Sequence, residues 1–242
     1  IIMIKLENLQ VCGFEPAIRG MRNPLNSWDR SDTTYCSAHC CEETWQIDLA
    51  QRCGGMAPFI GENDMSLMKR LIKAGSDHRK FMRMIVAYFD ITAPLYWWKE
   101  YDTYKVGNYT DPNNVLNSCS TMHTIHKKPF TFDDFSIPYR GTDIMDSNEA
   151  YIQGVYQNII NALNEMRDKY LETGDKKYWN TMIQMLPESY NQKRTAMVNY
   201  ETLLNMYFSR KNHKLQEWRD FCNWIRFLPY SELITEAKKW ED

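Results

Sequence analysis

The pattern of hydrophobic and polar positions changes period along the chain and so divides it into predicted strands and helices. Residues 2–11 alternate between apolar and polar types, which is typical of a strand. In residues 61–75 the apolar positions instead recur at helical spacing. We therefore expect a helix there, with Asn63 or Asp64 as its cap and Gly75 as its end.

The middle of the chain predicts a strand that turns directly into a helix. Residues 81–92 are rich in branched and aromatic side chains, as expected of a buried strand. Ala93-Pro94 should end this strand, because proline cannot donate to a sheet and suits the first turn of a helix. A short helix should then occupy 95–105, and residues 107–122 are rich in turn-forming types, which predicts a loop.

The second half of the chain is mainly helical in its pattern. A long helix is predicted from Ser147, as its cap, to Gly174, as its end. Its buried face should be formed by a stripe of five residues, Tyr151, Val155, Ile159, Leu163 and Met166. A further helix should run toward Leu186-Pro187, followed by a strand at 191–200 and helices at 201–211 and 213–229. With no repeat, linker or break in composition, residues 1–242 predict a single α+β domain.

Composition indicates an ordinary globular protein with many aromatic rings. Of the 242 residues, 43% are hydrophobic and 25% charged, which is sufficient for a sizeable core. Aromatic residues reach 14%, and such rings either fill cores or line sites for flat ligands. For the pair Trp97 and Trp98 the core interpretation is favoured, because large aromatic side chains are usually buried.

Charge and hydropathy narrow the class of partner. A net charge of −2 argues against a general nucleic-acid-binding protein, which needs a basic excess. No run of apolar residues is long enough to span a membrane, and the first residues lack the features of a signal peptide. We therefore expect a cytoplasmic protein that does not bind membranes.

Four of the seven cysteines fall within one short window around His39 and raise the question of a metal site. Zinc sites usually combine two closely spaced pairs of ligands, and this window has no second pair. The favoured interpretation is small thiols without a metal, with a structural zinc module as the alternative. The residues concerned are Cys36, His39, Cys40, Cys41 and Cys53.

Two blocks of the sequence carry a resemblance to a known family. In the C-terminal block, the chain runs from Leu186-Pro187 through Val198-Asn199, Leu203 and Asn205 to Arg210 and His213. This spacing resembles the C-terminal signature of the flavin-dependent thymidylate synthases. In the second block, residues 91–107 resemble the element of that family in which a strand ends in Ala-Pro and continues as a helix.

The resemblance implies a fold, an activity and an assembly. Members of the family are α+β proteins with a mixed sheet and long helices, and they form homotetramers in which the sites lie between subunits. They transfer a one-carbon unit from methylenetetrahydrofolate to the pyrimidine nucleotide dUMP, using a reduced flavin (FAD). Divergent sequences of this kind look like those of bacteria and their phages. The resemblance thus implies a flavin-dependent methyltransferase of nucleotide biosynthesis.

The resemblance also assigns roles to individual residues. FAD would be held by Asn199 and Asn205, whose amides suit the edge of a flavin, by Lys105 as a cation for phosphate, and by His78. Arg210 would be the catalytic cation that orients the pyrimidine substrate. The substrate would also contact two further residues, Glu100, which falls under a family glutamine, and Ser120, in a loop that resembles a family Ser-containing loop.

The chain departs from the family at positions that matter for phosphate binding. Thr103, Tyr104 and Lys105 stand under the family's Arg-His-Arg motif, so that only one of its charges is kept. Glu201 stands where the family has an arginine, and this charge reversal would repel a phosphate. The alternative hypothesis is therefore a binding or structural protein on the same scaffold that has lost the chemistry.

Overall fold

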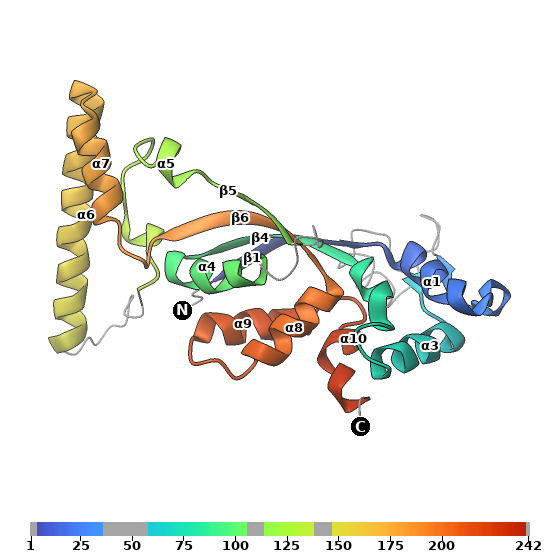
Figure 1. The fold of residues 1–242 in the computed structure, drawn as a ribbon. Helices are drawn as coiled ribbons and strands as arrows, with labels where there is room; N and C mark the ends of the chain where they lie inside the picture. Colours follow the sequence, from blue (N-terminus) through green and yellow to red (C-terminus); the bar gives the residue numbers. More distant parts are fainter. Residues whose placement is uncertain (1–3, 36–57, 106–113, 138–146, 241–242) are drawn as a thin grey trace, which may run out of the picture. The chain divides into compact units, whose positions relative to one another are not determined.

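This computed structural model describes residues 4–35, 58–105, 114–137 and 147–240, and its strands form two sheets (Figure 1). The larger sheet has four strands in the order β1-β4-β6-β5. The smaller pairs β2 and β3 antiparallel, with Thr34 opposite Phe59 and Tyr35 opposite Pro58. The strands are β1 (Lys5–Cys12), β2 (Thr34–Tyr35), β3 (Pro58–Phe59), β4 (Val86–Pro94), β5 (Asn114–Ser118) and β6 (Asn191–Asn199).

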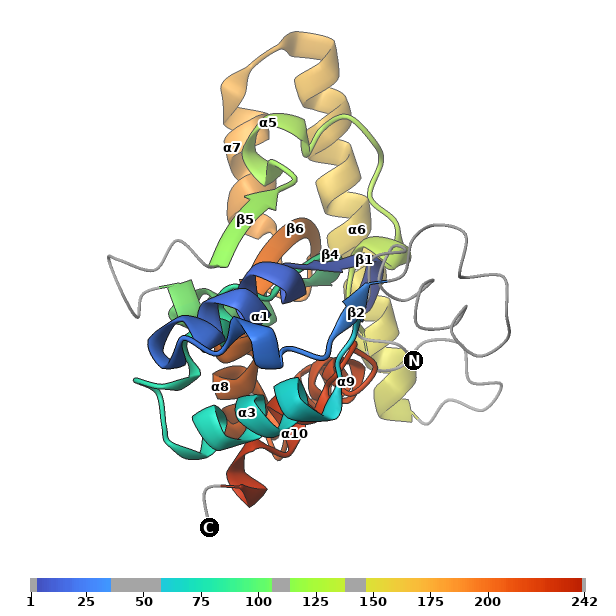
Figure 2. The same ribbon diagram turned by 90° about the vertical axis from the view of Figure 1, so that its right-hand side faces the viewer.

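Helices account for most of the remaining described residues (Figure 2). The α-helices are α1 (Phe14–Arg22), α3 (Glu62–Lys73), α4 (Leu95–Tyr101), α5 (Thr121–Thr124), α6 (Ser147–Thr173), α7 (Lys176–Met185), α8 (Tyr200–Arg210), α9 (Gln216–Ile225) and α10 (Glu232–Thr235). The 3-10 helices are η1 (Asn23–Leu25), η2 (Trp28–Arg30), η4 (Arg79–Arg83), η5 (Asp102–Lys105), η6 (Phe132–Asp134) and η7 (Ala237–Lys239).

The chain divides into two compact units, each assembled from separate segments of the sequence. Unit 1 comprises residues 1–5, 92–101 and 117–194, and unit 2 comprises residues 6–91, 102–116 and 195–242. Each of the four strands of the larger sheet crosses the boundary between these segments. The single domain expected from the sequence stays a prediction.

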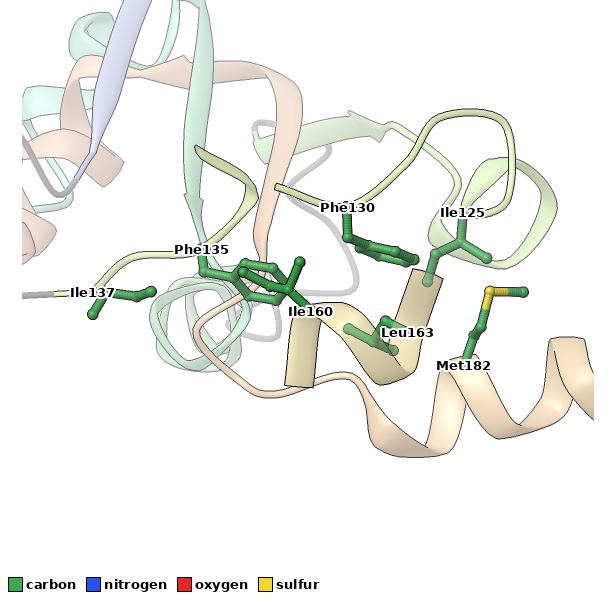
Figure 3. Close-up of a cluster of buried hydrophobic side chains, with 7 residues drawn as sticks. All are labelled: Ile125, Phe130, Phe135, Ile137, Ile160, Leu163 and Met182. Carbon is green, nitrogen blue, oxygen red and sulfur yellow. The ribbon is translucent and has the colours of Figure 1, made fainter. Parts of the chain in front are cut away.

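The core of unit 1 combines aromatic and aliphatic side chains from α5, α6, α7 and the segment around η6. Figure 3 shows its seven buried members, with Leu163 of α6 next to Met182 of α7. Asn164 holds the segment around η6 to α6, since its amide exchanges two hydrogen bonds with the backbone of Phe130. The cluster consists of Ile125, Phe130, Phe135, Ile137, Ile160, Leu163 and Met182.

Helix α4 belongs to unit 1 and carries the paired tryptophans Trp97 and Trp98. Strand β4 ends at Pro94 and α4 begins at Leu95, as the sequence predicts. Trp97 and Trp98 are 0% and 1% exposed, which confirms the core interpretation. The Trp98 indole donates to the carbonyl of Gln192 over 3.0 Å, and the Arg194 guanidinium lies 4.2 Å from the centre of its ring.

The predicted buried stripe of α6 is wrong over the first half of the helix. Leu163 is fully buried, but Tyr151 is 73% exposed and Val155 is 39% exposed. The reason is length, because the 27 residues of α6 extend over about 40 Å and the 10 residues of its neighbour α7 over about 15 Å. The two helices run side by side only where α7 reaches (Figures 1 and 2).

Unit 2 is held together by helices that bury apolar side chains and by ion pairs, of which the pair of Arg22 and Asp64 is almost fully buried. Helix α8 buries Leu203, Met206 and other side chains, and it packs against α9, α10 and η4. Arg22 of α1 donates its Nε to Asp64 of α3 over 2.6 Å, and both side chains are almost fully buried. The pair joins the end of α1 to the start of α3.

Three predictions about local structure need correction. The strand predicted from residue 81 begins only at Val86, because Phe81 to Arg83 belong to the 3-10 helix η4. The N-cap of α3 is Gly61 and not Asn63 or Asp64, because the carboxylate of Asp32 accepts the backbone N–H groups of both residues and replaces a cap from within the helix. Residues 114–118 form β5, although the sequence of this segment predicts a loop. Turn-forming residues tolerate this strand because sheet pairing supplies hydrogen bonds that local propensity does not anticipate.

The predicted cysteine cluster from Cys36 to Cys53 lies outside the described residues. Among the residues that the structure describes, Cys12 and Cys119 are exposed free thiols and Cys222 is buried. No described helix is both long enough and apolar enough to cross a bilayer.

Candidate functional site

Helix α8 and its cap carry three of the predicted site residues, and the first of them, Asn199, caps the helix. Asn199 is completely buried, and its side-chain oxygen accepts the backbone N–H of Thr202 over 2.8 Å. Its amide nitrogen Nδ2 is also buried and has no hydrogen-bond partner among the described residues. A buried donor without a partner costs free energy, so this atom marks a place where a ligand acceptor or a water would be stabilised.

Arg210, at the other end of α8, is held by two aromatic side chains. Its Nε donates to the hydroxyl of Tyr104 over 2.9 Å. Its guanidinium carbon lies 4.9 Å from the centre of the Trp218 ring and 5.6 Å from that of Tyr104. Hydrogen bonding and cation–π attraction together fix the orientation of this cation before any ligand arrives.

Within one chain the three α8 residues do not face one another. Asn199 and Arg210 are eleven positions apart, which corresponds to roughly 16 Å along a helix axis. Asn205 is exposed and is turned by about 120° from Asn199 around the axis, whereas Asn199 is buried. The helix therefore presents these groups at separate places.

Glu201, the charge reversal noted in the sequence, is neutralised by two arginines of η4. Its carboxylate pairs with Arg79 over 3.2 Å and also accepts a hydrogen bond from Arg83. Glu201 is only 8% exposed, so these pairs offset the cost of burying its charge.

His78 lies beside an apolar cavity of unit 2. It precedes η4, is exposed, and lines a cavity of about 340 Å³. The cavity walls are mainly apolar, with Asp77, His78 and Lys80 as the polar groups, and include Met21, Leu25, Leu71, Phe81 and Met84. An apolar cavity with a few polar groups is the usual form of a small-molecule site.

Ser120 lies in unit 1, where it caps α5 and lines a larger cavity. Its Oγ accepts the backbone N–H of His123 and lies 2.8 Å from His123 Nδ1. The cavity measures about 670 Å³ and is bordered by hydroxyl, amide and lysine side chains, among them Thr121, Gln192 and Lys193. Burial raises the pKa of Tyr190, which also lines it, so this phenol stays protonated at neutral pH.

The two remaining predicted site residues are Glu100 and Lys105. Glu100 is half-buried on α4 in unit 1, where its neighbour Lys99 pairs with Glu188 over 2.6 Å. Lys105 is the last residue of η5, and its side chain lies outside the described part of the structure.

The buried thiol of Cys222, on α9, is unreactive at neutral pH. Burial raises the pKa of the Cys222 thiol to about 12, although Arg226 and Arg210 act in the opposite direction. The group is therefore a protonated thiol at neutral pH and not a nucleophile.

Sequence reasoning missed the environment of Arg210 and of Glu201. Tyr104 was known only as a replacement within a family motif, and its hydroxyl proves to hold Arg210. The pairing of Glu201 with Arg79 and Arg83 joins residues more than a hundred positions apart. A buried glutamate at the start of α8 was the available signal, since such a charge requires a partner.

Comparison with known proteins supports the fold. No protein-family model and no curated protein sequence matches the chain. Solved structures do match, among them two of the flavin-dependent thymidylate synthase ThyX from Helicobacter pylori, both with FAD and dUMP. The first is 15% identical with a TM-score of 0.60, and the match covers 96% of this chain and 99% of that chain. The second is 15% identical with a TM-score of 0.61, covering 99% and 100%.

These matches define the class of fold. The chain has the α+β fold of the flavin-dependent thymidylate synthases over nearly its whole length, which confirms the fold predicted from the two sequence blocks. A structural match at 15% identity shows the fold of this chain and does not show its activity.

Proposed function

We propose that this protein binds a flavin and a pyrimidine nucleotide and is a divergent flavin-dependent thymidylate synthase-like enzyme. The observation that carries the proposal is the fixed orientation of Arg210 between Tyr104 and Trp218. An arginine held in this way is suited to a carbonyl-rich or anionic ligand, because its planar fork loses little freedom on binding. The structural neighbours from Helicobacter pylori are complexed with FAD and dUMP, which fits this class of ligand.

Two features of unit 2 fit a flavin. The cavity beside His78 has apolar walls for a flat ring, and its polar groups are few. The unpartnered Nδ2 of Asn199 is a buried donor that suits a carbonyl acceptor. FAD would supply the hydride for the reduction. His78 lines this cavity, whereas Asn199 and Asn205, the other residues that the resemblance assigns to FAD, are not among its lining residues.

The residues of this chain have separable roles in the proposed reaction. Arg210 would orient the pyrimidine and stabilise negative charge that develops on its carbonyl oxygens. Tyr104 would act as a positioning residue by fixing the Arg210 guanidinium through its hydroxyl. The resemblance assigns Glu100 and Ser120 to nucleotide binding and Lys105 to a phosphate.

A complete site requires groups that one chain presents separately. Asn199 and Arg210 lie at opposite ends of α8, and the family resemblance implies sites between subunits. We therefore propose a homo-oligomer, a tetramer by resemblance, in which α8 of one copy is completed by another. A bacterial or phage origin and a cytoplasmic location stay predictions from the sequence.

A second candidate is a non-catalytic binding protein on the same scaffold. It is favoured by the hydrogen bond from Arg210 to Tyr104, since Tyr104 replaces a charged residue of the family motif and is engaged within the protein. In this case flavin or nucleotide binding would survive without turnover. The two candidates differ in turnover and share the binding site.

The test begins with the visible absorption of the purified protein and a titration with FAD. Asn205 and His78 can be substituted without disturbing the core, because both side chains are exposed. We expect Asn205→Ala and His78→Ala each to weaken FAD binding about tenfold, as the loss of one good hydrogen bond predicts. Ser209→Ala, another exposed position of α8, is the matched control. A protein that takes up no FAD would contradict the proposal.

A further inference from the structure

Unit 2 contains a second cavity whose chemistry differs from that of the cavity beside His78. It measures about 480 Å³ and lies between α3 and the segment from the end of α1 to Arg30. Its polar wall is formed by three arginines, two serines and an asparagine, namely Arg22, Arg30, Arg70, Ser27, Ser66 and Asn63. None of the described residues that line it is a carboxylate. We call this cavity the arginine pocket.

Arg22 is the fixed member of the arginine pocket. It is 3% exposed, and its guanidinium donates to Asp64, to the carbonyl and hydroxyl of Ser27, and to the carbonyl of Arg30. These bonds hold Ser27 and the backbone of Arg30 at the cavity wall. The wall is thus built by buried contacts and is not an accident of flexible surface side chains.

Arg30 and Arg70 are the adaptable members. Both are exposed, and within the described residues neither side chain makes a hydrogen bond or ion pair. Two carboxylates of the same segments are engaged elsewhere, because Asp32 caps α3 and Asp64 binds Arg22, Ser31 and Thr33. Positive charge therefore accumulates around the cavity without an opposing charge in its wall, which favours an anionic ligand.

We infer that the arginine pocket binds a phosphate or diphosphate group. Guanidinium forks match the oxygens of phosphate, and the hydroxyls of Ser27 and Ser66 with the amide of Asn63 would satisfy the oxygens that remain. Leu25 lines both this pocket and the cavity beside His78, so one ligand could extend from an apolar part into a phosphate group. The shared chemistry has two sources, the diphosphate of a flavin dinucleotide or a separate phosphate compound.

Calorimetric titration with inorganic pyrophosphate at low salt tests the inference without a flavin. We expect the wild-type chain to bind, and the double variant Arg30→Gln with Arg70→Gln to bind at least tenfold more weakly. The matched control is Lys73→Gln with Lys214→Gln, which removes the same charge from exposed positions outside the pocket, and should bind within twofold of wild type. No binding by wild type, or equal weakening in both double variants, would overturn the inference.

All four substituted side chains are exposed, so both double variants should fold, and thermal melting checks this. If the arginine double variant melts early, Arg30→Gln and Arg70→Gln alone carry the test, each with a severalfold loss of pyrophosphate affinity. Unchanged affinity in both single variants would count against the pocket.

Titrations with FAD and with riboflavin, which lacks phosphate, show whether the bound phosphate belongs to a flavin dinucleotide or to a separate compound. A loss of FAD affinity in the arginine variant, with riboflavin unaffected, assigns the pocket to the flavin diphosphate. A loss of pyrophosphate affinity alone supports a separate phosphate ligand. Pyrophosphate binding by a protein that takes up neither flavin would sustain this inference and contradict the proposed function.

Discussion

At the scale of single residues, the buried pair of Arg22 and Asp64 contributes to the stability of unit 2. Asp64 accepts hydrogen bonds from Arg22, Ser31 and Thr33. Burial alone raises the pKa of Asp64, but the hydrogen bonds of Thr33, Ser31 and Arg22 outweigh this effect and hold the pKa below its usual value. The ionised carboxylate therefore stabilises the folded state.

We expect Asp64→Asn to lower the free energy of unfolding at neutral pH by about 3 kcal/mol, because Arg22 is left buried without its charged partner. The lowered pKa means that this contribution is present above the ordinary pKa of aspartate and is lost as the pH falls through the lowered value. Urea unfolding at neutral and acidic pH checks both points. A difference between wild type and variant that does not shrink toward acid would contradict the assignment.

Tyr104 and Arg210 give a second prediction at this scale. Tyr104→Phe keeps the aromatic ring but removes the hydroxyl that accepts from Arg210. We expect unfolding free energy to change by only about 1 kcal/mol and the affinity for dUMP to fall several-fold, because the guanidinium loses its orientation. Titration of dUMP into the FAD-loaded protein measures this effect. Equal dUMP affinity in the variant would remove the positioning role of Tyr104.

At the scale of elements, two glycines show how backbone geometry constrains the fold. Gly13 precedes α1 with a φ of 93°, and an added Cβ would lie 1.9 Å from the carbonyl oxygen of Met84. Gly154 lies inside α6 with nothing within 4 Å of an added Cβ. One position forbids a side chain and the other has room for it.

Gly13→Ala should therefore destabilise the protein by at least about 2 kcal/mol, through both backbone strain and the clash with Met84. Gly154→Ala is the matched control and should raise stability by about 0.5–1 kcal/mol, because alanine favours the helical backbone. Chemical denaturation of the two variants decides the comparison. Similar effects at both positions would contradict this account of the turn before α1.

Elements with a strong hydrophobic periodicity, or with a proline or glycine at their end, are predictable from the sequence. The end of β4 at Ala93-Pro94 and the long helix α6 follow from local rules that need no tertiary contact. Strand β5 and the capping of α3 by Asp32 were not predictable, because their hydrogen bonds come from partners distant in the sequence. The same reason hid the Arg79–Glu201–Arg83 cluster and the arginine pocket.

The predicted site residues show the same division. For Asn199, Asn205 and Arg210, the positions along α8 and its cap follow from the spacing of the sequence, and the cap at Asn199 is a local hydrogen bond. The side chains that surround Arg210 belong to η5 and α9, so only the folded chain reveals them.

At the scale of the whole molecule, the first half of α6 predicts an assembly. Tyr151 and Val155 belong to the apolar stripe of this helix and are exposed in the single chain. An apolar helix face left uncovered is a common sign of a protein interface. We propose that a second copy of the chain covers it, in line with the homo-oligomer expected from the resemblance.

Sedimentation velocity tests the assembly. The wild-type chain should sediment as an oligomer, and Tyr151→Glu with Val155→Glu should shift it toward monomer, because charges are costly in an apolar interface. The control pair Leu171→Glu and Met185→Glu changes exposed apolar residues elsewhere on α6 and on α7 and should leave the oligomer intact. A monomeric wild-type chain would contradict the proposal.

The central claim is that this chain binds a flavin, and a titration of FAD into the purified protein tests it most directly. The account predicts saturable binding with a shift in the flavin absorption, about tenfold weaker in Asn205→Ala and unchanged in Ser209→Ala. A protein that remains colourless and shows no saturable FAD binding would contradict the claim, whatever its fold.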